Sequence, residues 1–154
     1  MVTDWLRRLQ VPDCHWHEKL PGATDDEISA LRAFFRQPVP EDYEVFLRFA
    51  NGARISGNDD WYVRIWASYD IPTWGEAYAF FSDDIPGAMP IADDGGDECV
   101  VFDLRHEIES RHYAICEIPF TAISWDYARY KAPTLASVCC NSSGSPNCGK
   151  PQSQ

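Results

Sequence analysis

Long apolar runs are missing from this sequence of 154 residues. The longest fall far short of the roughly 20 residues that a helix needs to cross a bilayer, so no membrane-spanning helix is predicted. The first stretch, MVTDWLRRLQ, carries Asp4 early and has no apolar core of the kind found in secretory signals. We therefore expect a cytoplasmic protein without a membrane partner.

Paired cysteine motifs are also missing, although the chain has six cysteines. They form no C-x-x-C pair and no zinc-finger spacing. A cytoplasmic protein keeps its cysteines as thiols rather than disulfides. The segment CHWH at residues 14–17 brings Cys14, His15 and His17 together. No fourth ligand stands at a usable spacing, so a plain loop is favoured over a metal site. We predict neither a metal nor a cofactor.

Few patterns in the sequence indicate catalysis. No glycine-rich stretch is followed by Lys-Ser or Lys-Thr, as a phosphate-binding loop requires, and G-x-S-x-G does not occur. The turn DDGGD at residues 93–97 lacks the carboxylate pattern of an EF-hand, and its glycines suit a tight turn with positive φ. Cys99 and Cys116 could form a nucleophile with a histidine, but both fall in apolar segments, where inert thiols are common. We predict that the protein is not an enzyme.

Positive charge is scarce in the middle of the chain. Residues 59–109 hold 13 acidic side chains against only Arg64 and Arg105, a net charge of −11 that equals the charge of the whole chain. A field of this size repels nucleic acids and anionic lipids and attracts basic proteins. We therefore expect no nucleic-acid partner and a basic protein partner.

Two helices with a tight link are predicted in the first third of the chain. Thr24 and Glu27 form a capping box that opens a helix to about Arg36. Pro40 marks the start of a second helix, with acidic residues in its first turn. Its apolar stripe, at the spacing i, i+3, i+4, i+7, is Tyr43, Phe46, Leu47 and Ala50. Asn51-Gly52 can supply the left-handed residue that ends this helix.

Beyond Gly52 the apolar residues tend to recur at every second position, as they do in β-strands. Residues 12–22 are interpreted as a connection because Pro12, Pro21 and Gly22 interrupt them. Residues 74–81 fit either a helix or a strand. The predicted strands are residues 61–66, 89–91, 98–104 and 112–118, with a polar loop at 105–111.

Two motifs together resemble a known family. They are P-x-D-Y-x-x-F-L-x-x-x-N-G from Pro40 to Gly52 and MPIADDGGDECVVFDL from Met89 to Leu104. In this order, after a polar helix, they resemble the SUKH superfamily over roughly residues 23–140. That superfamily includes immunity proteins of bacterial polymorphic and contact-dependent toxin systems and a fungal regulator of cell-wall synthesis. The motif residues to which the resemblance gives a structural role are Pro40, Tyr43, Phe46, Leu47, Asn51, Gly52, Gly96 and Asp97.

The expected fold is α+β. N-terminal helices, including an amphipathic one at residues 1–10, pack on a mainly antiparallel sheet of about four to six strands. The resemblance implies this arrangement and a short closing helix at residues 133–140. We expect one SUKH-like domain over residues 1–140. Residues 141–154 are rich in Ser, Gly, Pro, Asn and Gln, so we expect a disordered tail there.

The leading functional hypothesis is a non-enzymatic immunity protein that binds and neutralises a cognate toxin, a basic nuclease-type domain. The alternative is an intracellular regulatory scaffold like the fungal branch of the superfamily. Acidic side chains in turns would speed association, and nearby tryptophans would anchor the partner. The predicted contact residues are Asp59, Asp60, Trp61, Trp66, Trp74, Asp83, Asp84, Asp93 and Asp94.

Overall fold

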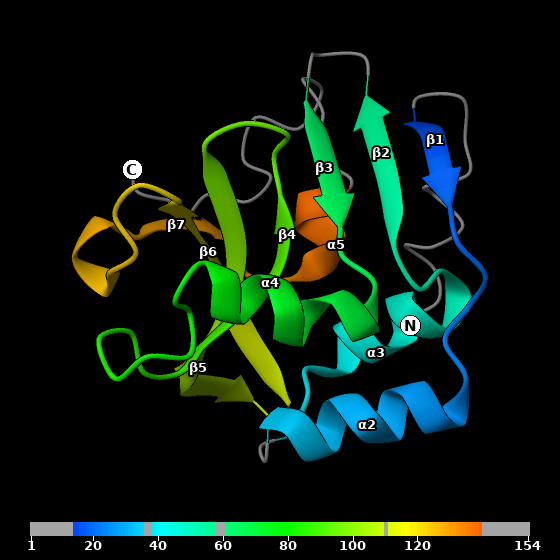
Figure 1. Ribbon diagram of the computed structural model, residues 1–154. Helices are drawn as coiled ribbons and strands as arrows, with labels where there is room; N and C mark the ends of the chain where they lie inside the picture. The colour runs from blue at the N-terminus through cyan, green and yellow to red at the C-terminus, as the bar shows by residue number, and fades with distance from the viewer. Residues whose placement is uncertain (1–13, 36–37, 58–60, 110, 140–154) are drawn as a thin grey trace.

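The protein folds as one antiparallel sheet with helices on both faces (Figure 1). The computed structural model describes residues 14–35, 38–57, 61–109 and 111–139. Its strands pair in chain order and are β1 (Cys14–Lys19), β2 (Ala53–Gly57), β3 (Tyr62–Ile65), β4 (Ala88–Asp93), β5 (Glu98–Glu109), β6 (His112–Pro119) and β7 (Arg129–Ala132). The helices are α2 (Asp25–Phe35), α3 (Glu41–Phe49), α4 (Ile71–Ala77) and α5 (Leu135–Cys139).

The predicted α+β class is confirmed, but the sheet has seven strands instead of four to six. The predicted connection at residues 12–22 is wrong, because Cys14–Lys19 forms the edge strand β1. The prolines and glycine flank this strand instead of interrupting it. The polar loop predicted at residues 105–111 is also wrong, since β5 continues to Glu109 and pairs there with β6. The predicted closing helix is present as α5.

The starts of both early helices follow the sequence signals. In the capping box, the Thr24 N–H donates to Glu27 Oε1 at 2.9 Å, and the Glu27 N–H donates to Thr24 Oγ1 at 3.1 Å. Helix α3 begins directly after Pro40. Its first N–H, that of Glu41, donates to the carbonyl of Arg111 at 3.1 Å. The turn after β5 therefore satisfies one of the N–H groups that a helix start leaves open.

The end of α3 differs from the prediction. The capping residue Ala50 is extended, with φ −150°, and the left-handed conformation occurs at Gly52, with φ +111°. A Cβ at Gly52 would lie 3.1 Å from Leu20 and 3.2 Å from Ala67, so the backbone there is closely enclosed. The buried Asn51 side chain accepts the N–H of Ser68 at 2.7 Å. Asn51-Gly52 thus ties the chain after α3 to the segment after β3.

One face of the sheet, the covered face, packs against α3 and α5. Cross-strand partners project to the same side, so Ile55, Val63 and Phe102 share this face. Tyr43 of α3 lies 6.0 Å from Phe102 between ring centroids, and Phe46 stacks on Trp16 of β1 at 6.2 Å. The predicted apolar stripe of α3 is confirmed, because its members are fully buried.

The opposite face, the open face, carries polar side chains in adjacent strands. Arg54, Arg64, Asp93 and Cys99 lie opposite one another in register across β2 to β5. Helix α4 lies in front of this face in Figure 1, while α5 lies behind the sheet. Residues 74–81, which fit helix or strand by sequence, are the end of α4 and a turn. The predicted helix at 1–10 and the predicted tail at 141–154 lie outside the described residues.

Candidate functional site

A hollow of the surface lies on the open face beside α4. It encloses about 730 Å³. Strand β3, helix α4, the turn between β4 and β5, and Phe120 after β6 surround it. We call it the α4 hollow, and its lining residues are Tyr62, Arg64, Trp66, Trp74, Ala77, Tyr78, Asp93, Gly95, Gly96, Asp97 and Phe120.

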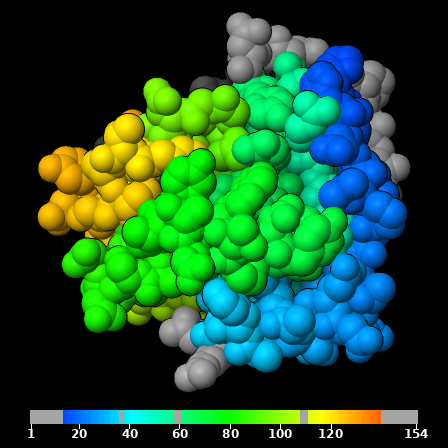
Figure 2. Space-filling model, in the orientation of Figure 1, coloured from blue at the N-terminus to red at the C-terminus, as the bar shows by residue number. Residues whose placement is uncertain are grey.

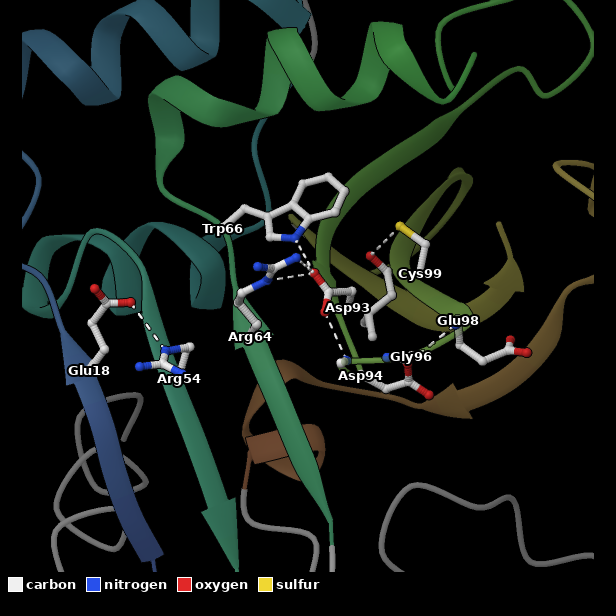
Figure 3. A network of polar contacts seen from close by, with 11 residues as sticks. Glu18, Arg54, Arg64, Trp66, Asp93, Asp94, Gly96, Glu98 and Cys99 are labelled. Carbon is white, nitrogen blue, oxygen red and sulfur yellow. Dashed lines mark hydrogen bonds and ion pairs between the residues drawn. The ribbon is translucent and has the colours of Figure 1, made fainter. Parts of the chain in front are cut away.

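The centre of this site is a buried carboxylate, Asp93, at the end of β4 (Figure 3). Its Oδ2 accepts hydrogen bonds from the Arg64 guanidinium and from Trp66 Nε1, each at 2.8 Å. Its Oδ1 accepts the N–H of Gly95, also at 2.8 Å. The expectation that Asp93 projects outward to a partner is wrong. Its side chain is only 3% exposed. It points inward because its two oxygens accept hydrogen bonds from Arg64, Trp66 and the following turn.

The predicted tight turn at residues 93–97 is confirmed. Asp94 Oδ1 accepts the N–H groups of Gly96 at 2.9 Å and of Glu98 at 3.2 Å. Gly95 takes φ +82°, and a Cβ there would lie 2.8 Å from the Tyr62 ring. The carbonyl of Asp97 accepts the N–H of Phe120 at 2.8 Å. The turn is therefore fixed to β3 on one side and to the end of β6 on the other.

Aromatic side chains form the wall of the hollow next to α4. Trp66 is 2% exposed, so it is a core residue and the prediction of an exposed anchor is wrong for it. Trp74 packs edge to face on Trp66 at 4.9 Å, and the Arg64 guanidinium lies 4.9 Å from the Trp74 ring. Tyr78, which is 44% exposed, contacts Phe120 at 4.5 Å. Trp74 and Tyr78 are the aromatic groups of this wall that are at least partly exposed.

The charged residues in the lining of the hollow are Arg64, Asp93 and Asp97. Arg64 is half-exposed but is paired with Asp93. The exposed side chain of Asp97 therefore supplies the remaining negative charge of this lining. A second hollow of about 310 Å³ shares Arg64, Trp66 and Trp74 with the first and reaches Glu18 and Arg54 of β1 and β2. The open face is thus a shallow, polar and aromatic surface that crosses several strands.

The remaining predicted contact residues are scattered. Trp61 is half-buried near α5, where it lines a small cavity with Val63 and Val138 instead of the α4 hollow. Asp83 and Asp84 are exposed on the loop after α4. Asp59 and Asp60 lie outside the described residues. Sequence reasoning missed Tyr62, Tyr78 and Phe120, because only the fold brings these aromatic residues to one surface.

The thiols considered as nucleophiles are poorly placed for that role. Burial raises the pKa of Cys99 well above its ordinary range and the pKa of Cys116 to about 11. Both therefore stay protonated at neutral pH, whereas the thiolate is the reactive form. Within the described residues, no group of three or more His, Cys, Asp or Glu side chains is arranged to hold a metal ion. The His15 and His17 side chains are exposed on β1.

These features define an α+β domain in which one face of the sheet is covered only in part. A family model described as SMI1 / KNR4 family (SUKH-1) matches residues 22–138, and the chain belongs to this family. The resemblance to the SUKH superfamily is thereby confirmed. Membership supports an immunity protein or an SMI1-like regulator and identifies no particular partner. A comparison with curated proteins finds no match. In the described part of the chain, no helix has the length and apolar character needed to cross a membrane.

Proposed function

We propose that this protein is a non-enzymatic immunity protein that binds a cognate bacterial toxin domain through its open face. The observation that carries this proposal is the α4 hollow, with Trp74 and Tyr78 on one wall and the exposed carboxylate of Asp97 in its lining. Aromatic side chains that become fully buried on binding supply most of the energy of a protein interface. Trp74 and Tyr78 are the proposed anchors.

The charge of the site favours a basic partner. Asp93 neutralises Arg64, so the remaining charge in the lining of the hollow comes from the Asp97 carboxylate. Nuclease-type toxin domains have basic clefts that bind phosphates, and an acidic protein can cover such a cleft. Complementary charge would mainly raise the association rate, while the aromatic anchors would slow dissociation.

Co-expression with the neighbouring gene tests the proposal most directly. If that gene encodes the toxin, the wild-type protein is expected to rescue growth. The variant Tyr78→Ala should bind the toxin more weakly, whereas Tyr127→Ala, which removes an exposed tyrosine from the segment after β6, should bind normally. Equal loss in both variants would place the interface elsewhere. Binding to intracellular proteins without any rescue from toxicity would instead favour the regulatory scaffold.

A further inference from the structure

A second aromatic surface lies where the end of α2 meets the loop after α4. Phe34 and Phe81 are 43% and 38% exposed, and their ring centroids lie 5.1 Å apart in an edge-to-face contact. Phe35 completes the group, at 5.2 Å from Phe34 and 5.9 Å from Phe81. We call these three side chains the phenylalanine cluster. Figure 2 shows the end of α2 (light blue to cyan) directly beside the green atoms of α4 and its loop.

The cluster forms one side of a hollow of about 360 Å³. The rest of its lining is formed by Phe80, Ser82, Asp83, Ile85, Pro86, Gly87, Ala88 and Leu104. This hollow shares no lining residue with the α4 hollow, although the same segment of chain supplies residues to both. Tyr78 faces the α4 hollow, and Phe81 faces this one. The loop after α4 therefore offers aromatic groups to two separate surfaces.

The local backbone holds Phe81 in this outward position. The N–H of Phe80 donates to the Gly75 carbonyl at 2.8 Å, and the N–H of Ala79 donates to Glu76 at 3.0 Å, which is a Schellman ending of α4. Ala79 takes the left-handed conformation with φ +63°, where glycine is usual. As a result Phe80 is buried at 1% exposure while its neighbour Phe81 stays at the surface.

Helix α4 also makes room for the Phe81 ring. A Cβ at Gly75 would clash with the Phe81 ring, so the ring packs directly against the helix backbone. Glycine inside a helix is unfavourable compared with alanine. Its presence at this position fits a ring that is held in place at the edge of the hollow.

Two exposed carboxylates stand next to the cluster. Asp83 lines the hollow, and Asp84 follows it. The loop is closed by Ser82, whose hydroxyl donates to the Ala79 carbonyl at 3.1 Å and accepts the Asp84 N–H at 3.3 Å. No ion pair joins either carboxylate to another residue of the described ranges. Apolar surface and free negative charge thus lie side by side.

We propose that the phenylalanine cluster, with Asp83 and Asp84, is a second docking surface for a segment of the partner protein. That segment carries a large apolar side chain next to lysine or arginine. The apolar side chain fills the hollow beside Phe34 and Phe81, and its basic neighbours face the two carboxylates. The inference rests on the proposed function in one respect, since it assumes that the partner is a basic protein.

Peptide titration tests this surface without any toxin. A short peptide with one leucine flanked by lysines is added to the full-length, isotope-labelled protein, and backbone amide shifts are followed by NMR. Saturable shifts are expected at residues 34–35 and 80–84. The same peptide with glutamates in place of the lysines should give none, because the carboxylates repel it. Absence of shifts with the lysine peptide, or equal binding of both peptides, would overturn the proposal.

Matched variants assign the binding to the cluster. Phe81→Ser is expected to weaken the lysine peptide roughly tenfold, as loss of an aromatic contact does. Phe34→Ser serves in its place if Phe81→Ser fails to fold. Asp83→Asn with Asp84→Asn should weaken binding and reduce its dependence on salt. The controls Tyr127→Ser and Asp126→Asn alter exposed residues of the segment after β6 and should change nothing.

Sedimentation tests whether the phenylalanine cluster instead binds a second copy of this chain. A dimer that Phe81→Ser converts to a monomer would overturn the proposal. The outcome is also separable from that of the proposed function. Peptide binding at the cluster without rescue from toxicity would disprove the immunity role and leave this surface in place. Rescue that survives Phe81→Ser, together with no binding of the lysine peptide, would disprove this docking surface and leave the immunity role in place.

Discussion

The two faces of the sheet differ in what covers them. On the covered face, Ile55, Val63 and Phe102 are buried beneath α3 and α5. On the open face, Arg54 and Arg64 occupy equivalent positions in the neighbouring strands, and α4 leaves a hollow of about 730 Å³ beside them. The covered face is therefore packed with apolar side chains, while the open face combines buried polar groups such as Asp93 with a hollow at the surface.

Carboxylates divide into those that hold the fold together and those that are exposed. Asp42 and Glu44 of α3 are buried and each has a structural partner. Asp83, Asp84 and Asp97 are exposed. The chain therefore cannot use all of its negative charge for a partner, because some of it holds the fold together.

The largest expected effect is on the free energy of unfolding and concerns the covered face. Phe46→Ala should lower the free energy of unfolding by roughly 3–5 kcal/mol, since it removes a fully buried ring and leaves a cavity against Trp16. Chemical denaturation measures this change. Phe34→Ala, at a half-exposed position, is the matched control and should cost far less. Equal losses would mean that the stripe of α3 is not the core.

The next largest expected effect is also on stability, and it concerns Glu44 and depends on pH. Burial raises the pKa of Glu44, but hydrogen bonds from Arg32 and the charge of Arg111 more than offset it, so the pKa lies below its ordinary value of 4.5. Its contribution to stability is therefore present above pH 4.5 and is lost as the pH falls through the lowered pKa. Glu44→Gln should cost about 1–2 kcal/mol at pH 7 and less at pH 3.5. Urea melts at both pH values check this difference.

The contribution of Asp42 to stability should change with pH in the opposite direction. Burial raises its pKa above the ordinary value of 3.8, although its hydrogen bond from Leu135 acts against this. The charged form is thus disfavoured in the fold, and the associated stability is present below pH 3.8 and is lost as the pH rises through the raised pKa. Asp42→Asn keeps an acceptor for the Leu135 N–H and should be tolerated better than Asp42→Ala, which leaves it unpaired at about 1–3 kcal/mol. Equal losses at pH 7 would contradict this account.

On the open face the expected effect is on binding. Tyr78→Ala should speed dissociation of the toxin roughly tenfold and change the unfolding free energy by no more than about 0.5 kcal/mol. Asp97→Lys should slow association, and that slowing should fade as salt passes about 0.15 M, where the Debye length is ~8 Å. Surface binding kinetics measure both rates, with Asp126→Lys as the control. A Tyr78→Ala variant that unfolds would show that the open face is also structural.

The smallest expected effect is a gain in stability. Ala79→Gly should raise the unfolding free energy by about 0.5–1 kcal/mol, because glycine takes the left-handed conformation without strain. Thermal melts detect this, and Ala77→Gly, inside α4, should destabilise instead. If Ala79→Gly also weakens the lysine peptide, the left-handed residue contributes to positioning Phe81.

The sequence predicted those parts of the fold that depend on local signals. The capping box at Thr24, the start of α3 after Pro40 and the turn at Gly95 all act within a few residues, and each was found. Strand β1 was missed because only Cys14 and Trp16 of CHWHEK are even partly buried, which leaves a weak alternation. Strand β7 was missed for the same reason, since RYKA is a short, charged edge strand.

The candidate site was harder to predict, because its contacts join distant parts of the chain. Asp93 follows a strand and precedes two glycines, a position that usually projects outward. Its inward orientation depends on Arg64 and Trp66, which lie 29 and 27 residues earlier in the sequence. No local pattern reports such a pairing. The acidic composition predicted the sign of the surface charge but not which carboxylates remain free.

The hydrogen bond between Asp42 and Leu135 has a consequence for folding kinetics. Short turns join β4 to β5 and β5 to β6, so these strands can pair early as hairpins, whereas α2 and α3 separate β1 from β2. The two residues of this bond, however, are 93 positions apart in the chain. During synthesis, α3 can therefore pack early, but its buried carboxylate lacks its final partner until α5 has left the ribosome. We expect this last docking step to be the one that makes the native state fully resistant to proteolysis.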